Sequence, residues 1–324
     1  MTSGEVGQVP ATACLEVDVK PPWPYRLPRG GGGDAVMRVR QGIVTRLLHV
    51  EGRPAVVRAA QRRDGSVLLR ADGASDADCA RACERMRFAL GVDDDYHPLY
   101  AEFRRDRLLG AAIRRQRWHR PRRRPWAWEA LAWSITKQLI ESSRAAEIQR
   151  QMVFRWGVRG RGPDGASLID VPTPELIAGR APAELAAMDL APARALAMIR
   201  AAREVSAGRV DPGEPSNDSR LLAIPEIGPW TVQCLGLYGR GEPDSLPAGD
   251  LGYVKLVGRL GGFGRRATVE EVEEFFAPYA PYRGLAGSFV LAAFHKLVAS
   301  GPPLRLAANA SRPARIRLGR AGGA

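Results

Sequence analysis

The first part of the chain alternates apolar and polar residues with the two-residue period of a half-buried strand. Leu15, Val17 and Val19 alternate with polar neighbours in this way. Three further strand-like segments are separated by turn-forming Gly, Pro and Asp: residues 44–50, 55–60 and 66–70. Residues 76–91 then have a helical pattern. The pattern predicts a small α+β module with an antiparallel sheet over residues 14–95.

The rest of the chain follows a helical period. In residues 126–139 the apolar side chains Trp128, Leu131, Ile135 and Leu139 recur at spacings of three and four. Thr173 and Pro174 have the residue types of a helix cap and first turn. Similar patterns predict helices at residues 98–117, 143–156, 192–207 and 284–299. We therefore expect a mainly α protein with an all-helical body at residues 96–300, a disordered segment at 1–13 and a flexible basic tail at 301–324.

Positive charge is concentrated in arginine. The 324-residue chain has a formal net charge of +13, and it contains only four lysines. A strongly basic protein is a candidate partner for nucleic acid, although high arginine content also follows from codon bias. Residues 104–124 contain ten arginines and one aspartate, Asp106. This segment either binds phosphates or forms a solvated basic face.

Membrane and metal-binding patterns are absent from the sequence. No run of eighteen apolar residues predicts a membrane span. The four cysteines have no zinc-finger spacing and are expected to be reduced thiols: Cys14, Cys79, Cys83 and Cys234. We expect a cytoplasmic, nucleoid-associated monomer without a cofactor, a membrane partner or a protein partner.

Two short helices joined by a glycine turn are predicted at residues 218–238. Asn217 or Asp218 can cap the first helix, and Pro229 suits the first position of the second. Free backbone N–H groups at such a turn attract a phosphate, although an ordinary helical hairpin is the alternative. Asp250 follows ahead of an apolar helix. It is either a simple N-cap or a carboxylate held beside the hairpin.

Several sequence motifs resemble one family. The stretch LLAIPEIGPWTVQCLGLYG, followed by LPAGDLG, resembles the signature of the helix-hairpin-helix (HhH-GPD) DNA glycosylase superfamily, on its 3-methyladenine DNA glycosylase II (AlkA-like) branch. WEALAWSITKQLIESSRAAEI resembles another segment of that family, and the similarity covers roughly residues 85–296. The resemblance implies a helix-hairpin-helix core of two helical subdomains, preceded by the small α+β domain.

The resemblance also implies residue roles. Asp250 stands at the position of the essential aspartate, and Leu139, after Gln138, at that of a wedge that fills the gap left by a flipped base. Hairpin residues Ile227, Gly228 and Thr231 would grip a DNA phosphate, and Ile227 and Gly228 could hold a monovalent cation. Aromatic candidates for the walls of the base pocket are Trp230, Trp133, Tyr253 and Tyr282.

The sequence departs from the family pattern at several of these positions. Glu226 replaces the first glycine of the hairpin, and Lys137 replaces the glycine that usually precedes Gln138. Lyase members carry a lysine where this chain has Trp230, and iron–sulfur members need four C-terminal cysteines, whereas none follows Cys234.

The resemblance therefore implies a monofunctional DNA glycosylase of base excision repair. It would flip damaged, in particular alkylated, purines out of double-stranded DNA and remove them by hydrolysis. The alternatives are a non-catalytic DNA-binding protein and a glycosylase for a different lesion, such as deaminated purines.

Overall fold

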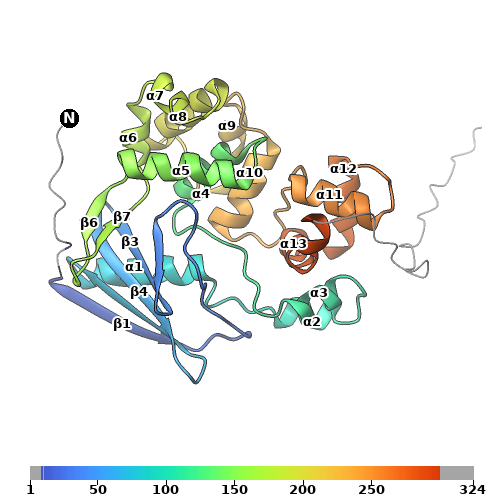
Figure 1. Ribbon diagram of the computed structural model, residues 1–324, viewed down its shortest axis with the longest axis horizontal. Coiled ribbons are helices and arrows are strands. Elements are labelled where there is room, and N and C mark those ends of the chain that lie inside the picture. Colours follow the sequence, from blue (N-terminus) through green and yellow to red (C-terminus); the bar gives the residue numbers. More distant parts are fainter. Residues whose placement is uncertain (1–8, 10, 300–324) are drawn as a thin grey trace, which may run out of the picture.

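The computed structural model describes residue 9 and residues 11–299 (Figure 1). The predicted basic tail at 301–324 and most of the predicted disordered segment at 1–13 lie outside the described residues. The described chain forms a sheet with one helix against it and two groups of helices, so the expected class, mainly α with a small antiparallel module, is confirmed.

The N-terminal sheet is built from the segments that alternate in the sequence. Within the described residues its strands are β1 (Ala13–Val19), β2 (Met37–Arg40), β3 (Ile43–Val50), β4 (Arg53–Gln61) and β5 (Val67–Gly73), in the order β1-β5-β4-β3-β2. Every pair is antiparallel. Helix α1 (Asp76–Leu90) is capped by Ser75 and buries Cys79, Cys83 and Met86 against the sheet. All four cysteines are free thiols.

The first helical group follows in the middle of the sequence. It contains α4 (Ala127–Lys137), α5 (Ser142–Trp156), α6 (Pro174–Ala178), α7 (Pro182–Ala186), α8 (Pro192–Ser206), α9 (Asp218–Leu222) and α10 (Pro229–Leu235). These helices share one apolar core. Thr173 caps α6 by accepting from the Leu176 amide, as predicted.

One part of the body was predicted wrongly. Strands β6 (Arg159–Arg161) and β7 (Ser167–Ile169) form a small antiparallel hairpin inside the region expected to be all-helical. Each strand has only three residues, which is too short for a two-residue alternation to be recognised. The hairpin packs β7 against β3, so it connects the helical body to the N-terminal sheet.

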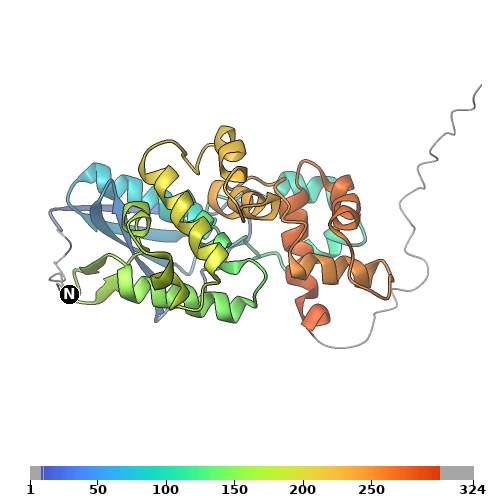
Figure 2. The same cartoon turned by 90° about the horizontal axis from the view of Figure 1, so that it is seen from above.

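The second helical group combines segments from both sides of the first. It contains α2 (His97–Phe103), α3 (Leu109–Arg115), α11 (Leu251–Leu260), α12 (Val269–Phe276) and α13 (Arg283–Ala299). Helix α3 packs on α13, and the group has a separate apolar core. Figures 1 and 2 both show α2 and α3 beside the C-terminal helices and apart from α4–α10. The two helical subdomains implied by the resemblance are therefore present.

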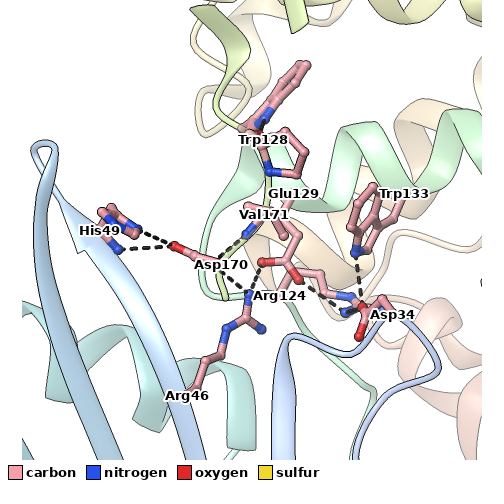
Figure 3. A network of polar contacts seen from close by, with 10 residues as sticks. Asp34, Arg46, His49, Arg124, Trp128, Glu129, Trp133, Asp170 and Val171 are labelled. Atoms are coloured by element: carbon pink, nitrogen blue, oxygen red, sulfur yellow. Dashed lines mark hydrogen bonds and ion pairs between the residues drawn. The ribbon is translucent and has the colours of Figure 1, made fainter. Parts of the chain in front are cut away.

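A buried polar network joins the sheet to the start of α4 (Figure 3). Arg46 of β3 bonds Glu129 of α4 at 2.5 Å and lies 3.6 Å from Asp170, which follows β7. Arg124 pairs with Asp34 at 2.6 Å and with Glu129 at 3.1 Å. Because these contacts hold the first turn of α4 to the sheet, they also fix the direction in which its last turn points.

The electrostatics of this network favour the charged forms of Arg46 and Asp34, whereas burial outweighs Arg46 and Arg124 and raises the pKa of the Glu129 carboxyl. Burial alone would lower the pKa of Arg46, but Glu129 and Asp170 outweigh burial and raise it. Burial likewise would raise the pKa of Asp34, yet Arg124 and Arg46 lower it. Asp34 also accepts a hydrogen bond from the Trp133 indole at 3.1 Å. The network is therefore a set of mutually compensating charges in the interior.

Candidate active site

The hairpin predicted between residues 218 and 238 is formed by α9, a tight turn and α10. Gly228 has an extended backbone and precedes Pro229, which opens α10 as expected from the sequence. The helix continues as a π-helical turn at Gly236–Arg240. The Ile227 amide bonds the Ile224 carbonyl, whereas the amides of Gly228 and Trp230 have no hydrogen-bond partner in the described part of the chain. Such free amides can bind an anion.

Gln138 connects the end of α4 to this hairpin. Its side-chain amide donates to the Glu226 carbonyl at 2.7 Å and to the Thr231 hydroxyl at 2.9 Å. Thr231 is buried, and the Ile227 side chain is part of the first helical core. The structure thus brings Gln138 against two hairpin residues that lie 88 and 93 positions away in the sequence. The buried side chains of Ile227 and Thr231 fix the turn from inside.

Leu139 is the most exposed large apolar side chain among the described residues. It is 100% exposed and has a positive φ of 55°, a conformation that a residue with a Cβ adopts at a cost. The Gln138 carbonyl beside it accepts a hydrogen bond from Arg194 of α8 at 2.5 Å. Two contacts of Gln138, one to the hairpin and one to α8, therefore hold Leu139 out into solvent.

Asp250 is the N-cap of α11 and is only partly buried. Its Oδ1 accepts from the Gly252 amide at 2.8 Å. Its Oδ2 has no hydrogen-bond partner among the described residues. Asp250 therefore caps its helix, as the simpler interpretation predicted, and still has one carboxylate oxygen available for another group.

Aromatic side chains lie on both sides of Asp250. A Cβ built on Gly249 would stand 3.7 Å from Trp230, so Trp230 packs beside the residue that precedes Asp250. Tyr253, one turn further along α11, is 1% exposed. The Tyr253 hydroxyl and the Trp230 indole N–H are buried without a hydrogen-bond partner in the described chain. Burial, followed by Tyr238 and Asp250, raises the pKa of Tyr253.

The other two aromatic candidates are placed differently. Trp133 is 2% exposed in the first helical core, where its indole N–H is bound to Asp34. Tyr282 is half-buried against the second helical core. Their assignment to a base pocket remains a prediction, and the geometry places them in the packing of the two helical groups.

Two residues near the site carry information that the sequence motifs did not supply. Arg194 supports the backbone next to Leu139, and nothing in its local sequence indicates that contact, since it depends on the packing of α8 against α4. In the sequence, Lys137 is recognisable only as a departure from the family pattern. It ends α4, and its charge interacts with that of Asp250.

Three arginines of the basic segment have internal partners. The Arg120 side chain, which is 7% exposed, donates to the Gly91 and Pro24 carbonyls. Arg123 pairs with Asp94, and Arg124 with Asp34. These arginines hold the segment between the two helical groups in place, so the hypothesis of phosphate binding does not extend to them.

The described residues contain neither a cluster of metal-binding side chains nor a membrane-spanning helix. No group of three His, Cys, Asp or Glu side chains is arranged to hold a metal ion in this part of the chain. None of the described helices is long and apolar enough to cross a membrane.

Comparison with known proteins gives related sequences, although no family model matches. The chain is 25% identical over 201 residues to a DNA-3-methyladenine glycosylase of Bacillus subtilis, covering 60% of this chain and 66% of that protein. It is 26% identical over 207 residues to a probable bifunctional transcriptional activator/DNA repair enzyme AlkA of Mycobacterium tuberculosis, covering 63% of this chain and 42% of that protein. The chain thus spans just under two thirds of the first relative and less than half of the second.

Solved structures share the fold over most of the chain. The 3-methyladenine DNA glycosylase of Archaeoglobus fulgidus aligns with a TM-score of 0.74 at 19% identity, over 87% of this chain and 98% of that one. MBOgg1 in complex with a low-affinity DNA ligand aligns with a TM-score of 0.68 at 19% identity, over 87% and 96%.

An 8-oxoguanine glycosylase/lyase of Clostridium acetobutylicum, bound to double-stranded DNA, aligns with a TM-score of 0.61 at 14% identity, over 81% of this chain and 98% of that one. The fold is therefore common to proteins of both the 3-methyladenine and the 8-oxoguanine type. The sequence and the fold together confirm the resemblance to the helix-hairpin-helix DNA glycosylases, with the curated relatives named for 3-methyladenine and AlkA.

Proposed function

We propose that this protein is a monofunctional DNA glycosylase of base excision repair, which removes damaged purines, in particular alkylated ones, from double-stranded DNA. The observation that carries the proposal is the environment of Asp250. One of its oxygens is free, it is accessible, and it stands beside Trp230 at the start of the hairpin's second helix. The relatives named above support the same reaction class.

The DNA would be held by the hairpin and opened by Leu139. The free amides of Gly228 and Trp230 suit a backbone phosphate, which needs donors but no particular base. A fully exposed leucine is unfavourable in water, but it can fill the space left by an extruded base. The fixed position of Gln138 would place that wedge at a constant distance from the phosphate grip.

Bond cleavage would depend on Asp250. Breaking the N-glycosidic bond develops positive charge on the sugar, and a nearby carboxylate stabilises that charge. The free Oδ2 is available for this role or for orienting the attacking water, while the bond from the Gly252 amide fixes Oδ1. Trp230 beside it offers an aromatic face, which attracts a positively charged alkylated purine.

Hydrolysis without strand cleavage is the expected outcome of base removal. A lyase step needs an amine that attacks the sugar, and the hairpin helix carries Trp230 where lyase members carry lysine. The Ile227 carbonyl has no hydrogen-bond partner among the described residues, so it could coordinate a monovalent cation that helps bind the phosphate. No other cofactor is proposed.

A second candidate lesion is favoured by one observation. Lys137 ends α4 directly before Gln138, and its charge interacts with that of Asp250. A deaminated purine, which is neutral and has a carbonyl oxygen, could accept a hydrogen bond from an ammonium group that would repel a cationic base. The non-catalytic alternative has no equivalent support, because it leaves the free oxygen of Asp250 without a use.

The test is release of abasic sites from methylated duplex DNA by the wild-type protein and by Asp250→Asn. Asparagine retains the carbonyl that caps α11, so the variant is expected to fold and to bind DNA normally. We expect its excision rate to fall by about 100-fold or more. Equal rates would remove Asp250 from the mechanism, and DNA binding without release by either protein would favour the non-catalytic alternative.

A further inference from the structure

Three turns with strained backbone meet around Leu139. Six residues other than glycine have a positive φ in the described chain, and three of them are Leu139 at 55°, Asp189 at 71° and Glu226 at 72°. Side chains connect these turns: Gln138 donates to the Glu226 carbonyl, and Arg144, in the first turn of α5, pairs with Asp189 at 2.5 Å. Strained backbone persists where the surrounding structure over-determines it, often at functional sites. The contacts that hold the turn at Leu139 are therefore candidates for a functional role.

Arg194 makes the contact nearest to Leu139. It lies in the first turn of α8, a helix that packs on α4, and its Nη1 donates to the Gln138 carbonyl at 2.5 Å. Gln138 is the C-cap of α4, so its carbonyl lacks a partner within that helix. This carbonyl is also the only hydrogen-bond partner of the Arg194 side chain in the described part of the chain. An arginine from another helix thus closes the end of α4.

Holding this carbonyl restricts where Leu139 points. The Gln138 carbonyl oxygen and the Leu139 amide nitrogen belong to one planar peptide unit, so fixing the oxygen fixes the plane. The Gln138 side chain is anchored separately to the hairpin, at the Glu226 carbonyl and the Thr231 hydroxyl. Because Leu139 is 100% exposed, packing does not hold its side chain in place. The orientation of Leu139 therefore depends on the bonds of Gln138, and the bond to the carbonyl comes from Arg194.

We propose that Arg194 is a positioning residue for the wedge: its bond to the Gln138 carbonyl holds Leu139 in the orientation that enters the duplex. This inference rests on the proposed glycosylase function and adds a residue of α8 to it. A wedge that is fixed before DNA binds loses little conformational freedom when it enters the base stack. A mobile leucine would have to be ordered in that step, which would slow the opening of a stable pair more than that of a weakened one.

A direct contact between Arg194 and DNA is the alternative. A guanidinium group matches the geometry of a phosphate, and a phosphate contact would strengthen binding to any duplex. Such a contact acts independently of Leu139, whereas positioning acts through Leu139. Variants at the two residues, alone and together, separate the two roles.

The experiment measures single-turnover excision of 7-methylguanine from two duplexes, in which the damaged base lies opposite cytosine or opposite thymine, where pairing is weaker. The quantity compared is the ratio of the paired rate to the mismatched rate. We expect Arg194→Met to lower this ratio by about fivefold, the effect of one lost hydrogen bond. Arg194→Lys retains a donor and should recover part of the loss. In a Leu139→Ala background, Arg194→Met should lower the ratio no further.

Arg203→Met is the matched control, since Arg203 also lies on α8 and also donates to a backbone carbonyl, that of Ala178 at 3.2 Å. It should leave the ratio unchanged, and urea unfolding of both methionine variants separates a loss of stability from a change in the ratio. Equal slowing on both duplexes by Arg194→Met, or a further fall of the ratio in the Leu139→Ala background, would overturn the inference in favour of direct DNA contact. If Arg194→Met does not fold, Arg194→Gln, which is polar but shorter than arginine, is judged by the same two criteria.

Failure of the proposed function would give a different result. If the wild-type protein releases hypoxanthine but not 7-methylguanine, the same ratio is measured with hypoxanthine in the two duplexes. If it binds both duplexes and releases neither base, the proposed function is wrong and the inference is wrong with it. A wild-type ratio in Arg194→Met, with excision intact, would overturn the inference alone.

Discussion

The two ends of α4 differ in whether their charged groups have an oppositely charged partner. At its start, Glu129 is fully buried and bonded to Arg46 and Arg124, within a network where every charged group has an oppositely charged neighbour. At its end, Lys137 has no counter-ion, and the nearby Asp250 and Tyr253 have oxygens without a hydrogen-bond partner in the described chain. Arg46 Nε and Asp34 Oδ1 at the start of α4 also lack a hydrogen-bond partner in the described chain, but the charges of these side chains are paired within the network. Buried polar groups normally have partners, so unpartnered groups beside an accessible carboxylate mark a position where a ligand can bind.

The largest expected effect comes from breaking the ion pairs at the start of α4. Arg46→Met removes the cation shared by Glu129 and Asp170, which leaves buried carboxylates with too little compensation. We expect the free energy of unfolding in urea to fall by about 3–5 kcal/mol.

The control for this variant is Arg150→Met, since Arg150 forms an exposed pair with Glu147 and should cost less than about 1 kcal/mol. The double variant Arg46→Met/Glu129→Leu should recover part of the loss, because it replaces the broken pair by apolar packing. A cost for Arg46→Met no larger than that for Arg150→Met would show that the network does not hold α4 to the sheet.

Leu139 is the most exposed feature at the other end of α4, and its truncation should affect function with little effect on stability. We expect Leu139→Ala to slow excision from a well-paired duplex by about tenfold, because the gap left by the flipped base is no longer filled. Excision from mismatched or single-stranded substrate should slow much less. Equal slowing on all three substrates would reject the wedge role.

The sequence predicted the residues at the end of α4 but not the polar network at its start. The helix itself followed from the spacing of Trp128, Leu131 and Ile135, and the family motif pointed to Gln138, Leu139 and Asp250. The network could not be predicted, since Arg46 and Glu129 are 83 residues apart and their contact depends on how β3 packs against α4. Charged residues in a sequence indicate no partner until the fold brings them together.

Short strands and helices were also difficult to predict from the sequence. Strand β2 was missed because four residues, MRVR, give too few alternations. Helix α12 was missed although Thr268 and Glu271 form a capping box, a signal that was present in the sequence. Helices with several turns of apolar spacing, such as α5 and α8, were predicted to within a residue or two. Pattern length, more than pattern type, decided which elements could be recognised.

A smaller effect should distinguish a tyrosine whose buried hydroxyl lacks a hydrogen-bond partner from one whose hydroxyl has a partner. Tyr253→Phe removes a buried hydroxyl that has no partner, so we expect the free energy of unfolding to rise by about 1 kcal/mol while excision slows severalfold. Tyr25→Phe is the matched control, since its hydroxyl donates to the Leu90 carbonyl at 3.1 Å, and it should lose about 1 kcal/mol. Unchanged excision by Tyr253→Phe would indicate that this hydroxyl serves no bound base.

The smallest effect concerns Glu226, which combines strain and charge at the hairpin turn. Its φ of 72° is in the left-handed region, which disfavours residues with a Cβ, and its carboxylate is exposed near the amides proposed to bind phosphate. Glu226→Gln removes only the charge. We expect it to bind duplex DNA a few-fold more tightly at low salt, with the gain shrinking as salt rises, and to unfold at the wild-type urea concentration.

Glu226→Gly removes both the charge and the strain. It should show the same gain in DNA affinity, measured by fluorescence anisotropy, and an increase of about 0.5–1 kcal/mol in the free energy of unfolding. If both variants bind DNA as the wild type does, the carboxylate does not face the phosphate. The hairpin's strained residue would then be tolerated because the Gln138 contact to its carbonyl holds the turn, and that contact would connect the hairpin to α4 independently of side-chain charge.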